Sequence, residues 1–129
     1  MNGVEVNYRV KTAQRYEAVF EKLLKKCGRR LKLKDFQVSV ALLGPQEMKT
    51  LNQRYRGRAK TTDVLSFEQV NEIVICYAEA EKQACQLKHS IKKELSRLFV
   101  HGLLHILGFD HRQESDYLEM ERLAAEILT

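Results

Sequence analysis

The sequence predicts an α+β fold in which helices cover a small mixed β-sheet and one helix is buried at the centre. Short segments that alternate apolar and polar side chains, as strands do, are interspersed with longer segments of helical periodicity. Residues 95–107 are apolar nearly all round, which is typical of a helix inside a protein. At 129 residues, 44% of them hydrophobic, the chain is predicted to form one domain over residues 1–129.

The first half of the chain is predicted to contain two strands and two helices. Residues 4–10 alternate as a half-buried strand does. Thr12 can cap a helix over residues 13–27, which Gly28 would end. Residues 36–43 form the next strand, and a helix from Pro45 to about Tyr55 follows. The side chains expected on the inner faces of the two helices are Val19, Phe20, Leu23 and Leu24, then Met48, Leu51 and Tyr55.

The second half is predicted to contain a hairpin and a long helical region. After a loop over residues 57–63, strands at 64–67 and 72–77 suit a hairpin. Helical pattern then extends from Ala78 to Gly108, which is longer than a typical globular helix, so we expect a break near residues 87–90. Residues 114–128 read as an amphipathic helix. Its predicted inward side chains are Tyr117, Met120, Leu123, Ala124 and Ile127.

Composition predicts a cytoplasmic protein that does not enter membranes. No apolar run approaches the ~20 residues of a membrane span, and the first five residues lack the basic start of a signal peptide. Cys27, Cys76 and Cys85 are odd in number and form no CxxC pair, which favours reduced thiols that act as small buried hydrophobes. Nothing in the pattern predicts an oligomeric state.

Positive charge is concentrated in the first half of the chain. Residues 1–60 carry 15 Lys and Arg against 5 Asp and Glu, a balance of +10, whereas residues 61–129 carry 7 against 12, a balance of −5. Cations in such a distribution can hold an RNA backbone without reading its sequence, although a solvated helix face has the same composition. The candidate phosphate contacts are Lys22, Lys25, Lys26, Arg29, Arg30, Lys32 and Lys34, then Lys49, Arg54, Arg56, Arg58 and Lys60.

Three histidines have the spacing of ligands to one metal ion. His101 and His105 are four residues apart, so a helix places both on one face. Gly108 can adopt a left-handed conformation that ends this helix and allows His111 to supply a third nitrogen. Three protein ligands with a fourth position open to water are typical of catalytic zinc, so we expect one Zn²⁺ per chain on the central helix. His89 lies outside the pattern and is expected at the surface.

The residue after the first histidine argues against a protease. In zincin proteases a Glu at this position is the general base that activates the metal-bound water. This chain has Gly102 there, so a zincin-like metalloprotease is the weakest of the functions that the ligand spacing allows.

Residues 101–111, HGLLHILGFDH, resemble the HGxLHLxGYDH signature of the YbeY family of metal-dependent single-strand endoribonucleases. LNQRYR at residues 51–56 and TDVLSF at 62–67 are similar to the family's LNxxYR and PTDVLSFP, and residues 73–75 fall where the family has GDIxI. The departures are Thr61 and Glu68 in place of prolines and Asn71 and Glu72 in place of Gly-Asp. They affect a loop and strand ends and leave the predicted ligands unchanged.

The resemblance implies a metal-dependent hydrolase that cleaves single-stranded RNA. It implies a role in maturation of ribosomal RNA, at the 3′ end of the small-subunit rRNA, and in ribosome quality control, with the ribosome as a partner. A zinc ion held by three imidazoles would lower the pKa of its bound water toward ~7, so that water could attack a phosphodiester without a Glu base. The alternative is a ribosome- or RNA-binding module with a structural zinc.

Arg56 in the LNxxYR block is the predicted catalytic residue. A guanidinium there would stabilise the negative charge that gathers on the phosphate oxygens in the transition state. The alternatives for Arg56 are a passive phosphate contact and a surface salt bridge. Asp110 is expected to orient a ligand histidine or to cap the turn, and Ser66 and Asp63 either line the cleft or terminate a strand.

Overall fold

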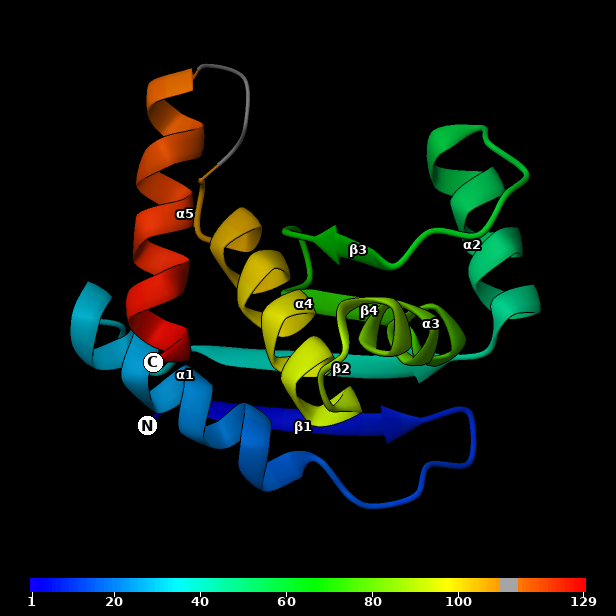
Figure 1. Cartoon of the computed structure of the whole chain (residues 1–129). Coiled ribbons are helices and arrows are strands. Elements are labelled where there is room, and N and C mark those ends of the chain that lie inside the picture. The colour runs from blue at the N-terminus through cyan, green and yellow to red at the C-terminus, as the bar shows by residue number, and fades with distance from the viewer. Residues whose placement is uncertain (110–113) are drawn as a thin grey trace.

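The computed structural model describes residues 1–109 and 114–129 and shows an α+β fold (Figure 1). The predicted fold class is confirmed. No helix within these residues is long and apolar enough to cross a membrane. The elements in chain order are β1 (Gly3–Tyr8), α1 (Glu17–Leu31), β2 (Gln37–Leu43), α2 (Pro45–Arg56), β3 (Val64–Phe67), β4 (Glu72–Cys76), α3 (Tyr77–Leu87), α4 (Ile91–Ile106) and α5 (Glu114–Leu128).

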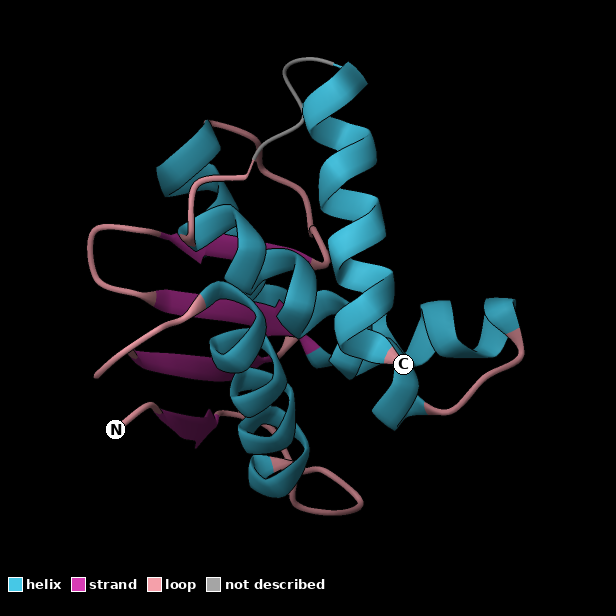
Figure 2. Cartoon of the chain, turned by 90° about the vertical axis from the view of Figure 1, so that its left-hand side faces the viewer, coloured by secondary structure: helices cyan, strands magenta, loops and turns pink. Residues whose placement is uncertain are grey.

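The four strands lie side by side in one mixed sheet (Figure 2). Their order is β1-β2-β4-β3; β2 runs parallel to both β1 and β4, and β3 pairs antiparallel with β4. The predicted hairpin is therefore confirmed. Since β3 is the last strand in this order, one of its edges has no strand beside it among the described residues.

The two faces of the sheet are covered by different helices. The larger apolar cluster joins one face of β2 and β4 to α1, α4 and α5, and a smaller cluster joins the other face to Met48 of α2. Helix α4 is the predicted buried helix. The Phe99 ring on α4 packs on the Phe20 ring of α1, with 4.8 Å between the ring centroids. The fully buried apolar side chains of α4 are Leu95, Leu98, Phe99, Val100, Leu103 and Leu104.

The boundaries predicted for the first helix are wrong. Helix α1 begins at Glu17, and Thr12 caps nothing, because its hydroxyl donates a hydrogen bond to the carbonyl of Gln14. Gly28 lies inside the helix, which ends at Leu31 with Lys32 in a left-handed conformation. A side-chain carbon on Gly28 would come within 2.7 Å of the Asn2 amide nitrogen, so the glycine permits close packing and does not end the helix.

The break predicted between the long helices is confirmed. Helix α3 ends at Leu87, followed by left-handed Lys88, and α4 begins after Ser90, whose hydroxyl accepts a hydrogen bond from the Lys93 backbone at 3.0 Å. Helix α3 starts directly at Tyr77, so no loop separates it from β4.

One predicted inward residue of α5 is wrong. Met120, Leu123 and Ile127 are buried as expected, whereas 43% of Tyr117 is exposed. Tyr117 lies in the first turn of α5, and this end of the helix extends beyond the end of α4 (Figure 1). Tyr117 is not part of the buried cluster that contains Met120, Leu123 and Ile127.

The three cysteines are free thiols, and two of them are buried. Burial raises the pKa of the Cys27 thiol to about 11 and also raises the pKa of Cys76, so both stay protonated at neutral pH. Cys85 is exposed on α3, which corrects the expectation that all three act as buried hydrophobes.

Candidate active site

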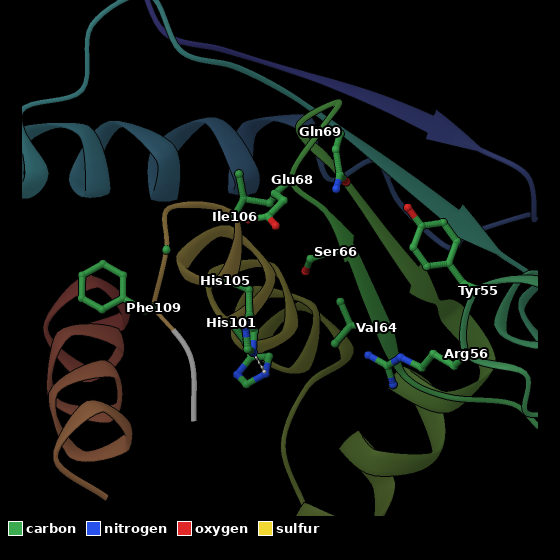
Figure 3. Close-up of a pocket in the computed structure, with 11 residues that line it drawn as sticks. Tyr55, Arg56, Val64, Ser66, Glu68, Gln69, His101, His105, Ile106 and Phe109 are labelled. Carbon is green, nitrogen blue, oxygen red and sulfur yellow. Dashed lines mark hydrogen bonds between the residues drawn. The ribbon is translucent and has the colours of Figure 1, made fainter. Parts of the chain in front are cut away.

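A cleft of about 430 Å³ opens between α4, the edge strand β3 and the C-terminal end of α2 (Figure 3). Helix α4 contributes His101 and His105, β3 contributes Ser66, and α2 contributes Arg56. These four predicted site residues come from three elements and line one cavity. The remaining lining residues are Tyr55, Val64, Glu68, Gln69, Ile106, Gly108 and Phe109.

His101 and His105 have the geometry of a metal-binding pair. Their Nε2 atoms are 3.2 Å apart, and the ring planes are inclined at 72°. Two nitrogens that each lie about 2.0–2.1 Å from a tetrahedral zinc ion would be about 3.3 Å apart. Both residues line the cleft, and the separation of their Nε2 atoms fits a zinc ion.

The third predicted ligand, His111, and its neighbour Asp110 lie outside the described residues. Among residues 1–109 and 114–129, no group of three His, Cys, Asp or Glu side chains is close enough together to hold a metal. The histidine pair is therefore the part of the predicted centre that the structure places.

The histidine pair lies at the C-terminal end of the buried helix α4. Gly108 has a φ of +103°, in the left-handed region as predicted, and its N–H donates to the His105 carbonyl at 3.1 Å. The Phe109 N–H donates to the Leu104 carbonyl at 3.0 Å, which closes the last turn. The helix thus ends within one turn of His105, with both rings at the edge of the core.

Gly102 is required by packing. A Cβ atom at this position would lie 2.9 Å from Cγ2 of Ile73 on β4 and 3.0 Å from Oγ of Ser66 on β3. Helix α4 can approach the hairpin this closely because residue 102 has no side chain. A Glu here, as in zincins, would point at the sheet. The sequence showed only that Gly102 replaces the general base of zincins, and the structure adds that a side chain at this position would clash with the sheet.

We expect Gly102→Ala to destabilise the fold by about 1–2 kcal/mol. Overpacking costs about 1–3 kcal/mol, and the better helix propensity of Ala recovers at most about 1 kcal/mol. Urea unfolding would measure the change. The matched test repeats the substitution in an Ile73→Ala background. There Gly102→Ala should lower the free energy of unfolding by less than it does in the parent, because the Ile73 methyl group that it would contact is absent. A Gly102→Ala protein as stable as the parent would contradict the packing role.

A buried charge network is centred on Glu94, about two helical turns before His101. Glu94 is fully buried, and its carboxylate accepts hydrogen bonds from Arg97 Nη2 at 2.5 Å and from His89 Nε2 at 2.9 Å. The Glu94 carboxylate raises the pKa of Arg97. His89 is half-buried, so its expected surface position was wrong: the ring is held by a carboxylate inside the fold. The network joins the start of α4 to the turn after α3, and Glu94 on an apolar helix was the signal for it.

Ser66 and Asp63 have different surroundings. Ser66 lines the cleft opposite Gly102. Asp63 lies outside the set of cleft residues: its carboxylate accepts hydrogen bonds from the Val64 N–H at 2.8 Å and from Gln83 on α3 at 3.3 Å. Asp63 therefore terminates the strand and ties it to α3.

Three of the cleft residues that were not predicted carry polar groups. Tyr55 was expected on the inner face of α2, yet 58% of it is exposed and it lines the cleft beside Arg56. Glu68 and Gln69 in the hairpin turn line the cleft as well. The departure at Glu68 therefore places a carboxylate in the cavity. Asn71 ends the same turn at a φ of +51°, a left-handed conformation that Asn tolerates in place of Gly.

A protein-family model described as Endoribonuclease YbeY matches residues 4–129. The chain belongs to the YbeY family. Curated proteins named Endoribonuclease YbeY are similar to it. The protein of Aquifex aeolicus is 38% identical over 104 residues, which cover 70% of this chain and 69% of that protein. The protein of Mycoplasmopsis synoviae is 32% identical over 126 residues, covering 87% and 81%. A solution structure of a Thermotoga maritima protein has a TM-score of 0.64 and 27% identity, covering 96% of this chain and 88% of that one.

The two YbeY-like sequence blocks meet at the cleft. Arg56 and Ser66 come from the block at residues 51–67, and His101 and His105 come from the second block. More than thirty residues of chain separate Ser66 from His101, and the fold brings their side chains to one cavity. Residues from both parts of the family pattern thus line the site.

Proposed function

We propose that this protein is a metal-dependent endoribonuclease that cleaves single-stranded RNA. The observation that carries the proposal is one cleft that combines a histidine pair at metal-ligand separation with an arginine. The family model and the curated relatives carry the name endoribonuclease, which supports RNA as the substrate. Ribosomal RNA at the 3′ end of the small subunit, the ribosome as partner and a cytoplasmic location are part of the same proposal.

The metal in this proposal is zinc, held by His101, His105 and His111. Neutral imidazoles are ligands that zinc prefers, and the measured separation of the first two suits it. When bound, zinc would supply a water molecule of lowered pKa as the nucleophile and a Lewis acid for the phosphate. The protein contributes two half-buried rings on one face of α4, with their Nε2 atoms 3.2 Å apart.

In this proposal Arg56 binds the scissile phosphate. It is the last residue of α2, and Gly57 ends the helix in a left-handed conformation, with its N–H donating to the Gln53 carbonyl at 3.0 Å. Figure 3 shows the Arg56 guanidinium pointing into the cleft from the side opposite the histidines. A phosphodiester between them would meet a guanidinium that hydrogen-bonds its non-bridging oxygens and offsets the charge of the transition state.

A basic surface on α1 supports binding of an RNA backbone. Lys22, Lys26, Arg29 and Arg30 line a shallow concavity with Glu126 of α5. Arg30 pairs with Glu126 at 3.0 Å; within the described residues no ion pair is found for the other three cations. Unpaired cations on one helix can neutralise phosphates of a chain whose scissile bond lies in the cleft.

The test is cleavage of a matched panel by purified protein free of other ribonucleases. A labelled 20-nucleotide RNA, the same strand in a duplex and the corresponding DNA would be incubated with zinc-loaded protein. We expect cleavage of the single-stranded RNA, at least roughly ten-fold slower cleavage of the duplex, whose bases are stacked and paired, and no cleavage of the DNA.

Chelation should stop cleavage and added zinc should restore it. Protein that binds the RNA but cleaves it no faster than His105→Ala would instead be an RNA-binding module with a structural zinc. Chelator-sensitive turnover of an unstructured protein such as casein would revive the metalloprotease alternative.

A further inference from the structure

Tyr55 is the most exposed large aromatic residue in the described parts of the chain, and it lies in the cleft. Its exposed fraction is 58%, and Arg56, Ser66 and both histidines line the same cavity. Figure 3 shows the Tyr55 ring on the Arg56 side of the cavity, with Phe109 at the far side beyond the histidines. An aromatic ring kept in water beside a phosphate-binding arginine is a surface that a ligand can cover.

The Tyr55 ring is held in place by the core below it. It packs edge-on against Phe67, with ring centroids 4.2 Å apart and planes at 78°. Phe67 is 7% exposed and belongs to the apolar cluster under α2. The contact fixes one side of Tyr55 and leaves more than half of the residue open. A ring that is already oriented loses little conformational entropy when a ligand stacks on it.

We propose that Tyr55 forms a stacking subsite for an unpaired nucleobase next to the scissile phosphate. The inference rests on the proposed function and adds to it the residue that selects single strands. Tyr55 and Arg56 are consecutive at the end of α2, as base and phosphate are adjacent in a nucleotide. Aromatic side chains stack on any unpaired base, so the subsite recognises single strands without reading sequence. A base in a duplex is already stacked between its neighbours and cannot reach the ring.

The test pairs changes in the protein with changes in the substrate. The variants are Tyr55→Phe, which keeps the ring, and Tyr55→Leu, which keeps an apolar contact with Phe67 but cannot stack as a ring does. The substrates are a 10-nucleotide RNA cleaved at one bond and a series in which an abasic nucleotide replaces each residue in turn. The measurement is kcat/KM.

We expect Tyr55→Leu to lose roughly ten- to hundred-fold in kcat/KM on the intact RNA, the range that stacking of one base supplies. Tyr55→Phe should retain most of the activity. One abasic position beside the cleaved bond should slow the parent protein by a similar factor and have little further effect on Tyr55→Leu, because both changes remove the same contact. Thermal unfolding should show that both variants fold.

Parent-like kinetics of Tyr55→Leu, or an equal response of both proteins to every abasic position, would overturn the inference and leave the proposed function intact. A large loss in Tyr55→Phe would assign the role to the hydroxyl and also overturn it. If the parent cleaves no RNA, the proposed function fails, and anisotropy binding of the same RNA series to the parent and Tyr55→Leu still decides whether the ring stacks on a base.

Discussion

His105→Ala should abolish RNA cleavage, with a loss of at least about a thousand-fold in kcat. Its Nε2 lies 3.2 Å from that of His101, and removing one of two converging nitrogens leaves the proposed zinc without a defined site. The ring is on the last full turn of α4 and only half-buried, so its loss should leave the fold intact. Cleavage of the 20-nucleotide RNA and zinc content by elemental analysis would be measured on the same preparation.

The matched control for this variant is His89→Gln. His89 is hydrogen-bonded to the Glu94 carboxylate and is absent from the cleft lining. A glutamine at this position keeps a hydrogen-bond donor for that carboxylate. The control should bind one zinc per chain and cleave RNA at the parent rate. Normal cleavage by His105→Ala would remove the histidine pair from the mechanism, and full zinc content in that variant would place the metal elsewhere.

Arg56→Ala should lower kcat by about a hundred- to a thousand-fold while the zinc content stays unchanged. The reason is that Arg56 comes from α2 and lies across the cleft from the histidines (Figure 3), so it can stabilise transition-state charge without being one of the proposed metal ligands. Single-turnover cleavage at saturating RNA would measure the effect on the chemical step. Arg56→Lys should recover only part of the rate, because an ammonium cannot make the bidentate contact of a guanidinium.

Arg58→Ala is the matched control for Arg56. Arg58 is exposed in the loop that follows α2 and is absent from the cleft lining, so its loss should change affinity modestly at low salt and leave kcat unchanged. A passive phosphate contact at Arg56 would give a different pattern, with a raised KM and an unchanged kcat. That outcome would contradict a role in the transition state.

Local patterns predicted most of the fold. Strand alternation, the apolar periodicity of α4 and the break near Lys88 are properties of short segments, and the structure confirms them. The predicted boundaries of α1 were wrong because a tertiary contact explains the glycine that suggested a helix end. Gly28 lies inside the helix and allows the Asn2 side chain to pack against it. The prediction for Tyr117 was wrong because helical periodicity identifies one face of α5 but does not show which turns of that face are buried.

By itself, the sequence determined which residues could bind a metal, because two histidines four apart share a helix face wherever that helix lies. Only the tertiary structure decided what surrounds them. It placed Arg56 and Tyr55 in the cleft with the histidines, gave Gly102 its close contact with Ile73 and joined the Asp63 carboxylate to Gln83 of α3. The physical reason is that these relations are distances between segments far apart in the chain. Packing of α4 against the hairpin sets such distances, and no local pattern encodes them.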